Sequence, residues 1–277
     1  MNERHRYVFV VILHNYLLIM YISTYILTYN SSKYIDEILY QVSKFSDEIV
    51  VVDSGSTDGT LEILKKRDNV CLLNRNFDNF KNQRNFAASK CKYDWLFFVD
   101  SDEIPDNILV ESLLEFKRQK FVPPEKVFSF SRKWVVMGRT IHSLYPVESP
   151  DNVVRLFNKS IVSFDENSNL VHETLGGYSQ RETLAGTINH RTFETKAEIY
   201  RKIEQYTSIA ARDMILRGRS ISYTKMIFDP PAAFVKWFFF KKGFLDGKVG
   251  IILGKYAYRY TKEKYCKALE LVNKKRV

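Results

Sequence analysis

Two groups of acidic and small polar residues are the strongest candidates for chemistry in this sequence. Residues 53–60 read DSGSTDGT and follow the apolar run at 48–52, and residues 100–103 read DSDE and follow the apolar run at 95–99. Short continuous apolar runs of this kind are typical of strands buried in a parallel sheet. Because ligands bind beyond the carboxyl ends of such strands, we expect both groups to line one crevice.

The first group suits a nucleotide. Its glycine and small side chains permit tight turns and the close approach of a ligand. Asp53 is placed to accept hydrogen bonds from a base or a ribose. The alternative is a surface turn in which Asp58 caps the start of the next helix.

The second group suits a cation. Asp100, Asp102 and Glu103 put three carboxylates within four residues, and like charges this close repel one another. Oxygen ligands suit Mg²⁺ or Mn²⁺, and such an ion would hold a substrate diphosphate and neutralise it as it leaves. The alternative is an acidic N-terminus for a helix that begins at Pro105, which the helix dipole favours.

The elements that must position these groups alternate between strand and helix. Neither a G-x-G-x-x-G nor a G-x-x-x-x-G-K-[ST] motif is present, which disfavours dinucleotide oxidoreductases and P-loop NTPases. We expect a doubly wound, mostly parallel α/β fold. The predicted strands are 22–28, 48–52, 70–73 and 95–99, and the predicted helices are 32–45, 60–67, 80–91 and 105–120, the last with Pro105 in its first turn.

The regular alternation of predicted strands and helices ends at Pro123-Pro124. Strands are predicted at 127–136, 153–157 and 161–164 without clear helices between them, and a helix is predicted at 197–216. We therefore divide the chain into a leader at 1–20, an α/β half at 21–122, a mixed half at 123–195 and a basic helical region at 196–277. Trp95 and Trp134 are assigned to the core.

Composition limits the class of protein. The chain has 277 residues, of which 45% are hydrophobic and 27% charged, and these proportions exclude disorder or collagen as the overall class. The three cysteines are odd in number and widely spaced, so we expect neither a disulfide framework nor a zinc cluster. We expect the protein to occupy a reducing compartment.

The positive charge is confined to one region. The formal net charge is +10, and residues 196–277 alone hold 19 Lys and Arg against 7 Asp and Glu. This asymmetry predicts an anionic partner for that region. Large aromatic residues mix with lysines at 230–260, after Pro230-Pro231, and this mixture favours an anionic membrane surface over a helix that only docks on the core. No nucleic-acid-binding motif accompanies the charge, so a nucleic acid is not expected.

The N-terminal apolar stretch does not predict a membrane span. If the first strand starts near Tyr21, only the 14 residues 7–20 remain, which is too short to cross a bilayer. The leader is then either a short interfacial segment or a stretch that precedes a native start at Met20.

Taken together, these motifs resemble the family 2 glycosyltransferases, which have a GT-A fold. The central motifs are EIVVVDSGSTDGT at 48–60, NQRNFA at 82–87 and DWLFFVDSDE at 94–103. GRTIH at 138–142, RLFNK at 155–159, VHETL at 171–175, INH at 188–190 and GFLDGKVG at 243–250 resemble the bacterial subgroup that includes the lipopolysaccharide core β-1,4-glucosyltransferases. The resemblance covers residues 21–271. The chain departs from it at Asn30-Ser31-Ser32, where the family commonly has an acidic run.

The resemblance implies roles for the strand-end residues. Asp53 would contact the nucleotide, and Asp58 would support its turn. Arg84 would lie near the donor diphosphate. Asp100 would approach the ribose or the metal, and Asp102 would be the main metal ligand.

Roles on the acceptor side follow from the same resemblance. Glu173 is the candidate general base that takes the proton from the attacking hydroxyl, and Glu103 is its rival or an acceptor contact. The other acceptor-side candidates are Tyr145, Arg155, His172 and His190; the two histidines have a structural role as the alternative.

The implied protein is a cytoplasmic, metal-dependent, inverting transferase on the inner face of the cytoplasmic membrane. Its donor would be a UDP-sugar, with UDP-glucose first, and its acceptor a lipopolysaccharide core or a lipid-linked glycan, with capsule as the close alternative. A nucleotidyltransferase would need a Gly-rich basic loop where residues 29–34 read YNSSKY. A non-catalytic membrane scaffold is the remaining alternative, and it would not bind UDP in a metal-dependent way.

Overall fold

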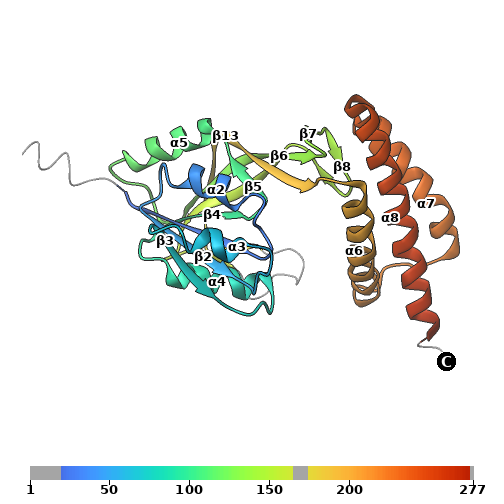
Figure 1. The fold of residues 1–277 in the computed structure, drawn as a ribbon. Coiled ribbons are helices and arrows are strands. Elements are labelled where there is room, and N and C mark those ends of the chain that lie inside the picture. Colours follow the sequence, from blue (N-terminus) through green and yellow to red (C-terminus); the bar gives the residue numbers. More distant parts are fainter. Residues whose placement is uncertain (1–19, 165–173, 275–277) are drawn as a thin grey trace, which may run out of the picture. The chain divides into compact units, whose positions relative to one another are not determined.

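The predicted alternation of strand and helix is present from Ile22 onward. The computed structural model describes residues 20–164 and 174–274. In it, β1 (Ile22–Thr28), β2 (Glu48–Asp53), β3 (Val70–Asn74) and β4 (Trp95–Asp100) lie in the order β3-β2-β1-β4, and each neighbouring pair is parallel (Figure 1). The strands at 22–28, 48–52, 70–73 and 95–99 are therefore confirmed, with ends one residue longer in three of them.

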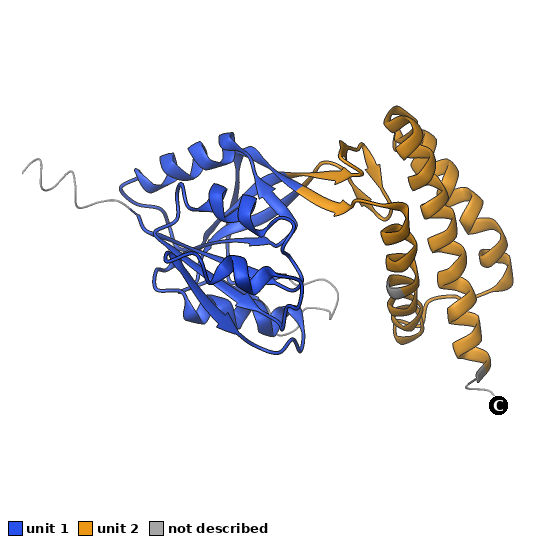
Figure 2. Ribbon diagram, viewed as in Figure 1, with its two compact units in different colours: residues 1–131, 152–189 blue, residues 132–151, 190–277 orange. Residues whose placement is uncertain are grey.

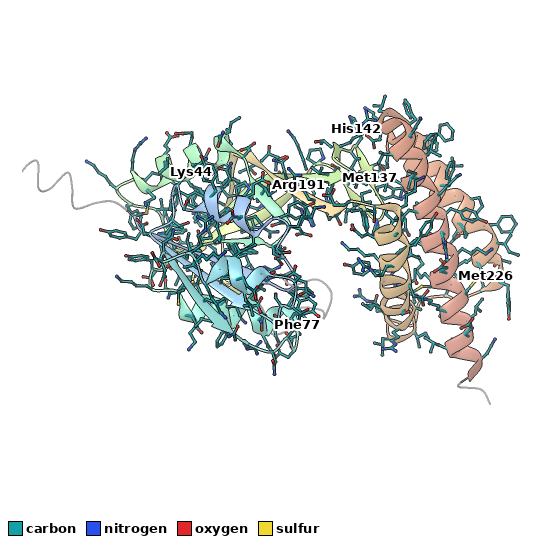
Figure 3. All side chains as sticks on the ribbon, viewed as in Figure 1. Lys44, Phe77, Met137, His142, Arg191 and Met226 are labelled. Carbon is teal, nitrogen blue, oxygen red and sulfur yellow. The ribbon has the colours of Figure 1, made fainter. Side chains whose placement is uncertain are left out.

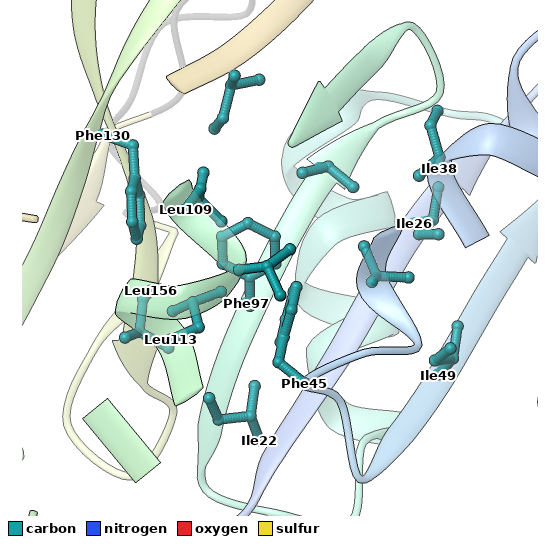
Figure 4. Packing of buried hydrophobic residues seen from close by; sticks show 14 of the residues in the cluster. Ile22, Ile26, Ile38, Phe45, Ile49, Phe97, Leu109, Leu113, Phe130 and Leu156 are labelled. Atoms are coloured by element: carbon teal, nitrogen blue, oxygen red, sulfur yellow. The ribbon is translucent and has the colours of Figure 1, made fainter. Parts of the chain in front are cut away.

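Helices cover both faces of this parallel sheet. Ile22 and Ile26 of β1 enter one hydrophobic cluster, whereas Tyr25 and Leu27 of the same strand enter another, as the two-residue period of a strand requires. The first cluster, shown in Figure 4, contains residues of α2 (Ile35–Val42), α3 (Thr60–Leu64) and α5 (Asn107–Lys117). The second contains Ala87 of α4 (Phe80–Lys90). The doubly wound α/β fold is confirmed.

The sheet continues into a mixed half. β10 (Asp151–Asn158) pairs antiparallel with β4, and the order then runs through β6 (Lys126–Val136) and β13 (Gln180–Phe193) to β5 (Glu103–Pro105). β7 (Arg139–Thr140) pairs with β6, and the short β11 (Ser163–Phe164) pairs with β12 (Leu175–Gly176). The 14-residue strand β13 is a feature that the hydrophobic pattern did not predict.

Pro105 does not begin a helix, contrary to expectation. It ends β5, and α5 begins at Asn107 with Asp106 as its N-cap. The Asp106 side chain accepts a hydrogen bond from the Leu109 amide at 2.8 Å, and the Asp106 amide donates to the Thr187 carbonyl of β13 at 2.9 Å. The aspartate supplies the acceptor that a helix start needs, so the boundary falls two residues later than the proline suggests.

The C-terminal region is helical, as predicted, but Pro230-Pro231 does not mark the start of a segment. The elements are α6 (Lys196–Leu216), α7 (Tyr223–Val235), the π-helical turn η1 (Lys236–Phe240), the 3₁₀ turn η2 (Gly243–Asp246) and α8 (Gly247–Lys274). Pro230-Pro231 lies inside α7 rather than opening a segment. Prolines disfavour a helix interior, but here extensive packing between α7 and α8 overrides that local preference.

The chain forms two compact units, which are coloured separately in Figure 2. Unit 1 comprises residues 1–131 and 152–189, and unit 2 comprises residues 132–151 and 190–277. Unit 2 includes the hairpin of β8 (Ser143–Leu144) and β9 (Val147–Glu148) and has a core of its own. This core includes Trp134, Val136, Phe193, Leu253 and Tyr256. The functional division at 20, 122 and 195 stays a prediction.

A search of the described residues finds no helix with the length and apolar character needed to cross a bilayer. The predicted leader lies outside the described residues apart from Met20, whose amide donates to the Lys117 carbonyl at 3.0 Å.

Candidate active site

The carboxyl ends of β1, β2 and β4 lie side by side, and the two acidic groups follow two of them. Thr28 at the end of β1 is in register with Asp53, and Leu27 is in register with Asp100. The hydroxyls of Ser31 and Ser101 are 2.7 Å apart, so the loop after β1 contacts the loop after β4. The structure therefore brings the predicted groups to one edge of the sheet.

Asp53 is fully buried, and its carboxylate organises the loop that follows β2. One oxygen accepts from the amides of Gly55 at 2.9 Å and Ser56 at 2.8 Å. The other accepts from the hydroxyls of Thr28 at 2.9 Å and Ser56 at 2.5 Å. These four bonds occupy the usual acceptor sites of a carboxylate, so Asp53 acts here as a positioning residue. Its direct contact with a nucleotide stays a prediction.

Asp58 ties the loop after β2 to the loop after β1. It accepts from the amide of Ser32 at 3.1 Å and from the hydroxyls of Ser32 at 2.8 Å and Thr60 at 2.5 Å. Desolvation acts to raise the pKa of Asp58, but the hydrogen bonds from Thr60 and Ser32 outweigh it and lower this pKa to about 2. Asn30 adds a second tie, because its side-chain oxygen accepts from the Thr57 amide at 2.8 Å. Asn30 and Ser32, which stand where the resembling family commonly has acidic residues, thus hold the loop after β2 with neutral side chains.

Arg84 reaches the end of β4 from helix α4. Its guanidinium donates to the Asp100 carboxylate at 2.7 Å and lies over the ring of Phe98, 5.0 Å from the centroid. Helix α4 starts at the N-cap Asn79, whose side chain accepts from the Asn82 amide at 2.8 Å. This start fixes the register of the NQRN motif, so that Arg84 faces the strand end.

Gln83 is a site residue that sequence reasoning missed. It is fully buried, and its amide nitrogen donates to the Ser54 hydroxyl at 3.0 Å and to the Arg75 carbonyl at 3.2 Å. It therefore braces the start of the loop after β2, whereas Ser32 contacts the loop at Asp58. The sequence clue to this role was its place beside Arg84 in the NQRN motif. In the structure, the helix that carries both residues packs against β1 and β2.

Arg155 and Glu103 form a buried ion pair beside Asp100. Arg155 donates from Nε to Glu103 at 3.0 Å and from Nη2 to the other oxygen at 2.7 Å, and the exposed fractions of the two side chains are 8% and 0%. The same Nη2 lies 3.6 Å from the second oxygen of Asp100. Two guanidinium groups therefore flank the Asp100 carboxylate.

This pairing bears on the role of Glu103. Both of its oxygens bind Arg155, and one also accepts from the Asp100 amide at 3.3 Å. A general base needs a free lone pair facing its substrate. The geometry therefore favours a positioning role for Glu103, which holds Arg155 against Asp100.

Two carboxylates at this edge suit a divalent ion. Asp100 is 29% exposed and Asp102 is half-buried, whereas Glu103 is taken by Arg155. Within residues 20–164 and 174–274, no three His, Cys, Asp or Glu side chains gather as a ligand set. Magnesium is commonly held by one or two carboxylates together with substrate phosphates, so Asp102 and Asp100 fit this mode of binding.

The acceptor-side candidates belong to different parts of the chain. Arg155 joins the strand-end cluster, but Glu173 and His172 lie outside the described residues. Tyr145 and His190 belong to unit 2. There Tyr145 packs on the ring of Trp237, with centroids 5.4 Å apart, and His190 stacks on Trp134 at 4.3 Å. The core assignments of Trp134 and Trp95 are confirmed, since both are buried.

Among the polar pairs of unit 2, the one between His142 and Asp246 connects two of the sequence motifs. The His142 amide donates to both oxygens of the buried Asp246 carboxylate at 3.0 Å, and Nδ1 of the ring lies 2.6 Å from one of them. His142, labelled in Figure 3, is 56% exposed. The GRTIH and GFLDGKVG motifs are thereby joined, which their separation in sequence did not reveal.

The fold and the strand-end cluster define an α/β protein with charged and polar side chains gathered beyond the carboxyl ends of its parallel strands. Residues 23–144 match the family model described as glycosyl transferase family 2. The match covers these residues, and the resemblance recognised from the motifs is confirmed. The match and the named relatives support a glycosyltransferase.

The chain is also similar to named relatives. An uncharacterized glycosyltransferase of Rickettsia prowazekii is 25% identical over 241 residues, covering 83% of this chain and 80% of the relative. The lipopolysaccharide core biosynthesis glycosyltransferase LpsC of Rhizobium meliloti is 25% identical over 250 residues, covering 83% and 88%. Among solved structures, S. aureus TarS 1–349 in complex with UDP-GlcNAc has a TM-score of 0.45 at 16% identity, with 92% of each chain covered.

Proposed function

We propose that this glycosyltransferase moves a hexose from a UDP-sugar, with UDP-glucose first, to a lipopolysaccharide core or another cell-surface glycan. The observation that carries the donor side is the cluster of Arg84, Asp100, Arg155 and Glu103 at the carboxyl end of β4. Guanidinium groups beside the partly exposed Asp100 carboxylate are suited to a metal-bound diphosphate. The acceptor class is supported by the name of the LpsC relative, and a capsule or other glycoconjugate acceptor is the alternative.

Each strand-end residue then has a task. Asp53 and Asp58 hold the loop after β2 in shape for the nucleotide. Arg84 lies beside the site of the diphosphate, and Asp102 with Asp100 would hold Mg²⁺ or Mn²⁺. When bound, this ion neutralises the charge that develops on the leaving diphosphate.

The acceptor must lose a proton as its hydroxyl attacks the anomeric carbon. Glu173 remains the candidate base for this step in an inverting reaction, and its role is a proposal from the family motif. Because Glu103 is held by Arg155, the geometry does not offer it as a rival.

We place this reaction on the inner face of the cytoplasmic membrane. The support is the basic and aromatic character of residues 230–260, together with an acceptor class that is attached to lipid. A lipid-attached acceptor is presented at that surface, so a peripheral enzyme meets it there.

The test is UDP release from a panel of UDP-sugars by the full chain, with Mn²⁺ or with chelator. Arg84→Ala is compared with Lys90→Ala, which removes an exposed cation from the same helix. We expect one preferred sugar, loss of release with chelator, and a decrease of about 10²-fold in Arg84→Ala alone, as for removal of a donor to developing charge. Circular dichroism shows whether both variants are folded. Failure of the wild-type chain to bind UDP or to release it from any sugar would favour the scaffold alternative.

A further inference from the structure

Helix α7 exposes an apolar face that its packing does not use. Tyr223, Ile227, Phe228 and Val235 recur at helical spacing and are 62%, 59%, 69% and 43% exposed. Other residues of α7 pack against α8. A surface helix normally has polar residues on its outer face, so an apolar outer face indicates a second environment.

The turn that follows α7 continues this face. Phe239, Phe240, Phe244 and Leu245 lie within seven residues and are 55%, 77%, 49% and 53% exposed. Close packing inside the turn explains their exposure, because a Cβ at Gly243 would lie 2.8 Å from the Trp237 carbonyl oxygen. The turn is closely packed at Gly243, and these four side chains lie on its outside.

Lysines surround the apolar residues. Residues 223–260 contain seven Lys and Arg against two Asp. One of these acids, Asp246, is buried against His142, and Asp229 accepts from the Tyr265 hydroxyl at 2.5 Å. Lys242, Lys248 and Lys255 are exposed and form no ion pair within the described part of the chain. Lys241 and Arg259 pair with Glu148 and Glu263, so the positive charge that remains uncompensated is that of the exposed lysines.

An open groove lies between α7 and α8 on the same surface. It has a volume of about 360 Å³ and is lined by Pro231, Phe234, Val235, Lys255 and Tyr258. Four of the five lining side chains are apolar or aromatic, and the fifth is a lysine. This combination suits a hydrocarbon chain that is attached to an anionic group.

We propose that α7, the 236–246 turn and the first half of α8 form one lysine–aromatic surface that docks on an anionic phospholipid bilayer. Phe239, Phe240, Phe244 and Leu245 enter the headgroup region, and the exposed lysines bind lipid phosphates. The groove receives part of an acyl chain. This inference rests on the proposed location of the enzyme at the cytoplasmic membrane, and it names the surface by which the enzyme would bind there.

A bilayer fits this surface better than a protein does. Lysine is depleted in protein–protein interfaces, whereas it is common beside aromatic residues at membrane surfaces. A second copy of the chain would bring like charges together. The mixture of exposed lysine with exposed phenylalanine therefore favours anionic lipid as the occupant.

The test is co-sedimentation of the full chain with vesicles of phosphatidylcholine alone or with phosphatidylglycerol. Phe240→Ser is compared with Phe121→Ser, because these side chains are 77% and 75% exposed but only Phe240 lies on the proposed surface. Lys242→Ala with Lys255→Ala is compared with Lys65→Ala with Lys66→Ala, a pair of exposed lysines in unit 1. UDP release without vesicles is measured on every variant.

We expect binding to anionic vesicles that weakens with salt. Phe240→Ser should weaken it about ten-fold, and the Lys242/Lys255 variant about five-fold for each lysine, while both controls bind like wild type. Equal binding to neutral vesicles, no binding to either, or equal losses in the controls would overturn the proposal. A soluble dimer that is dispersed by Phe240→Ser, with no vesicle binding, would assign the surface to a second copy. Unchanged UDP release in all variants would show that such a failure concerns docking and not the proposed reaction.

Discussion

Replacing Arg155 with methionine tests the part of the site that depends most on burial. The substitution keeps most of the aliphatic volume but leaves the Glu103 carboxylate, which is 0% exposed, without the guanidinium that binds both of its oxygens. Breaking a buried ion pair by removing one partner costs about 3–5 kcal/mol. The contact between the guanidinium and the Phe98 ring, at 4.6 Å, is lost as well. We therefore expect Arg155→Met to lower the free energy of unfolding of unit 1 by at least about 3 kcal/mol.

The assay is urea unfolding followed by tryptophan fluorescence. Of the three tryptophans, Trp95 lies in unit 1, and Trp134 and Trp237 lie in unit 2. A background in which the latter two are phenylalanine makes Trp95 the reporter of unit 1, and all comparisons are made in that background.

Two further variants separate a buried pair from a surface contact. Arg67→Met breaks the exposed pair with Asp36, whose side chains are 45% and 60% exposed, and it should cost less than about 1 kcal/mol. Adding Glu103→Gln to Arg155→Met removes the unpaired charge and should recover about half of the loss or more. A cost for Arg155→Met no larger than that of Arg67→Met, or no recovery in the double variant, would refute the reasoning.

Two more predictions concern the loops and strands around the site. Gly186 and Gly55 both have positive φ, but a Cβ at Gly186 would lie 2.3 Å from the Leu109 amide nitrogen, whereas a Cβ at Gly55 would meet nothing within 4 Å. Urea unfolding should therefore show a cost of about 1–2 kcal/mol for Gly55→Ala and a clearly larger cost for Gly186→Ala; equal costs would contradict the close approach of α5 to β13. The lowered pKa of Asp58, about 2, means that its stabilisation is complete above the unfolded pKa of about 3.9 and is lost as pH falls toward 2. The stability difference between wild type and Asp58→Asn, less than about 1 kcal/mol for this exposed loop, should therefore shrink between pH 5 and pH 2, and a constant difference would argue against the bonds from Ser32 and Thr60.

The parallel half of the fold could be predicted because its strands are buried on both faces. Continuous apolar runs such as 48–52 and 95–99 have few alternative structures, and polar residues mark where they end. The same logic placed Asp53 and Asp100 at one edge, and the registers of both strands with β1 confirm it. Local sequence patterns therefore sufficed to predict those strands whose buried residues follow one another in the sequence.

The features that were missed depend on contacts between distant residues. The first half of β13 is largely exposed, so it has no apolar signal, and it forms by pairing within the sheet. Pro230-Pro231 reads as a break in isolation, but α8 holds α7 helical through it. Glu103 and Arg155 are 52 positions apart, and only the pairing of β10 with β4 brings them together. Glu103, which its residue type made a candidate for catalysis, binds Arg155 through both of its carboxylate oxygens.

The central claim is that the carboxyl end of β4 binds a nucleotide diphosphate together with a metal ion. Calorimetric titration of UDP into the full chain tests it directly, with Mn²⁺ or with chelator, for wild type, Asp102→Ala and Asp68→Ala. Asp68 is an exposed aspartate of unit 1, outside the strand-end cluster, and is the matched control. We predict that chelator or Asp102→Ala weakens UDP binding at least about ten-fold, or about 1.4 kcal/mol, and that Asp68→Ala binds like wild type. UDP binding that is absent from the wild-type chain, or equally tight with chelator and in Asp102→Ala, would contradict the account.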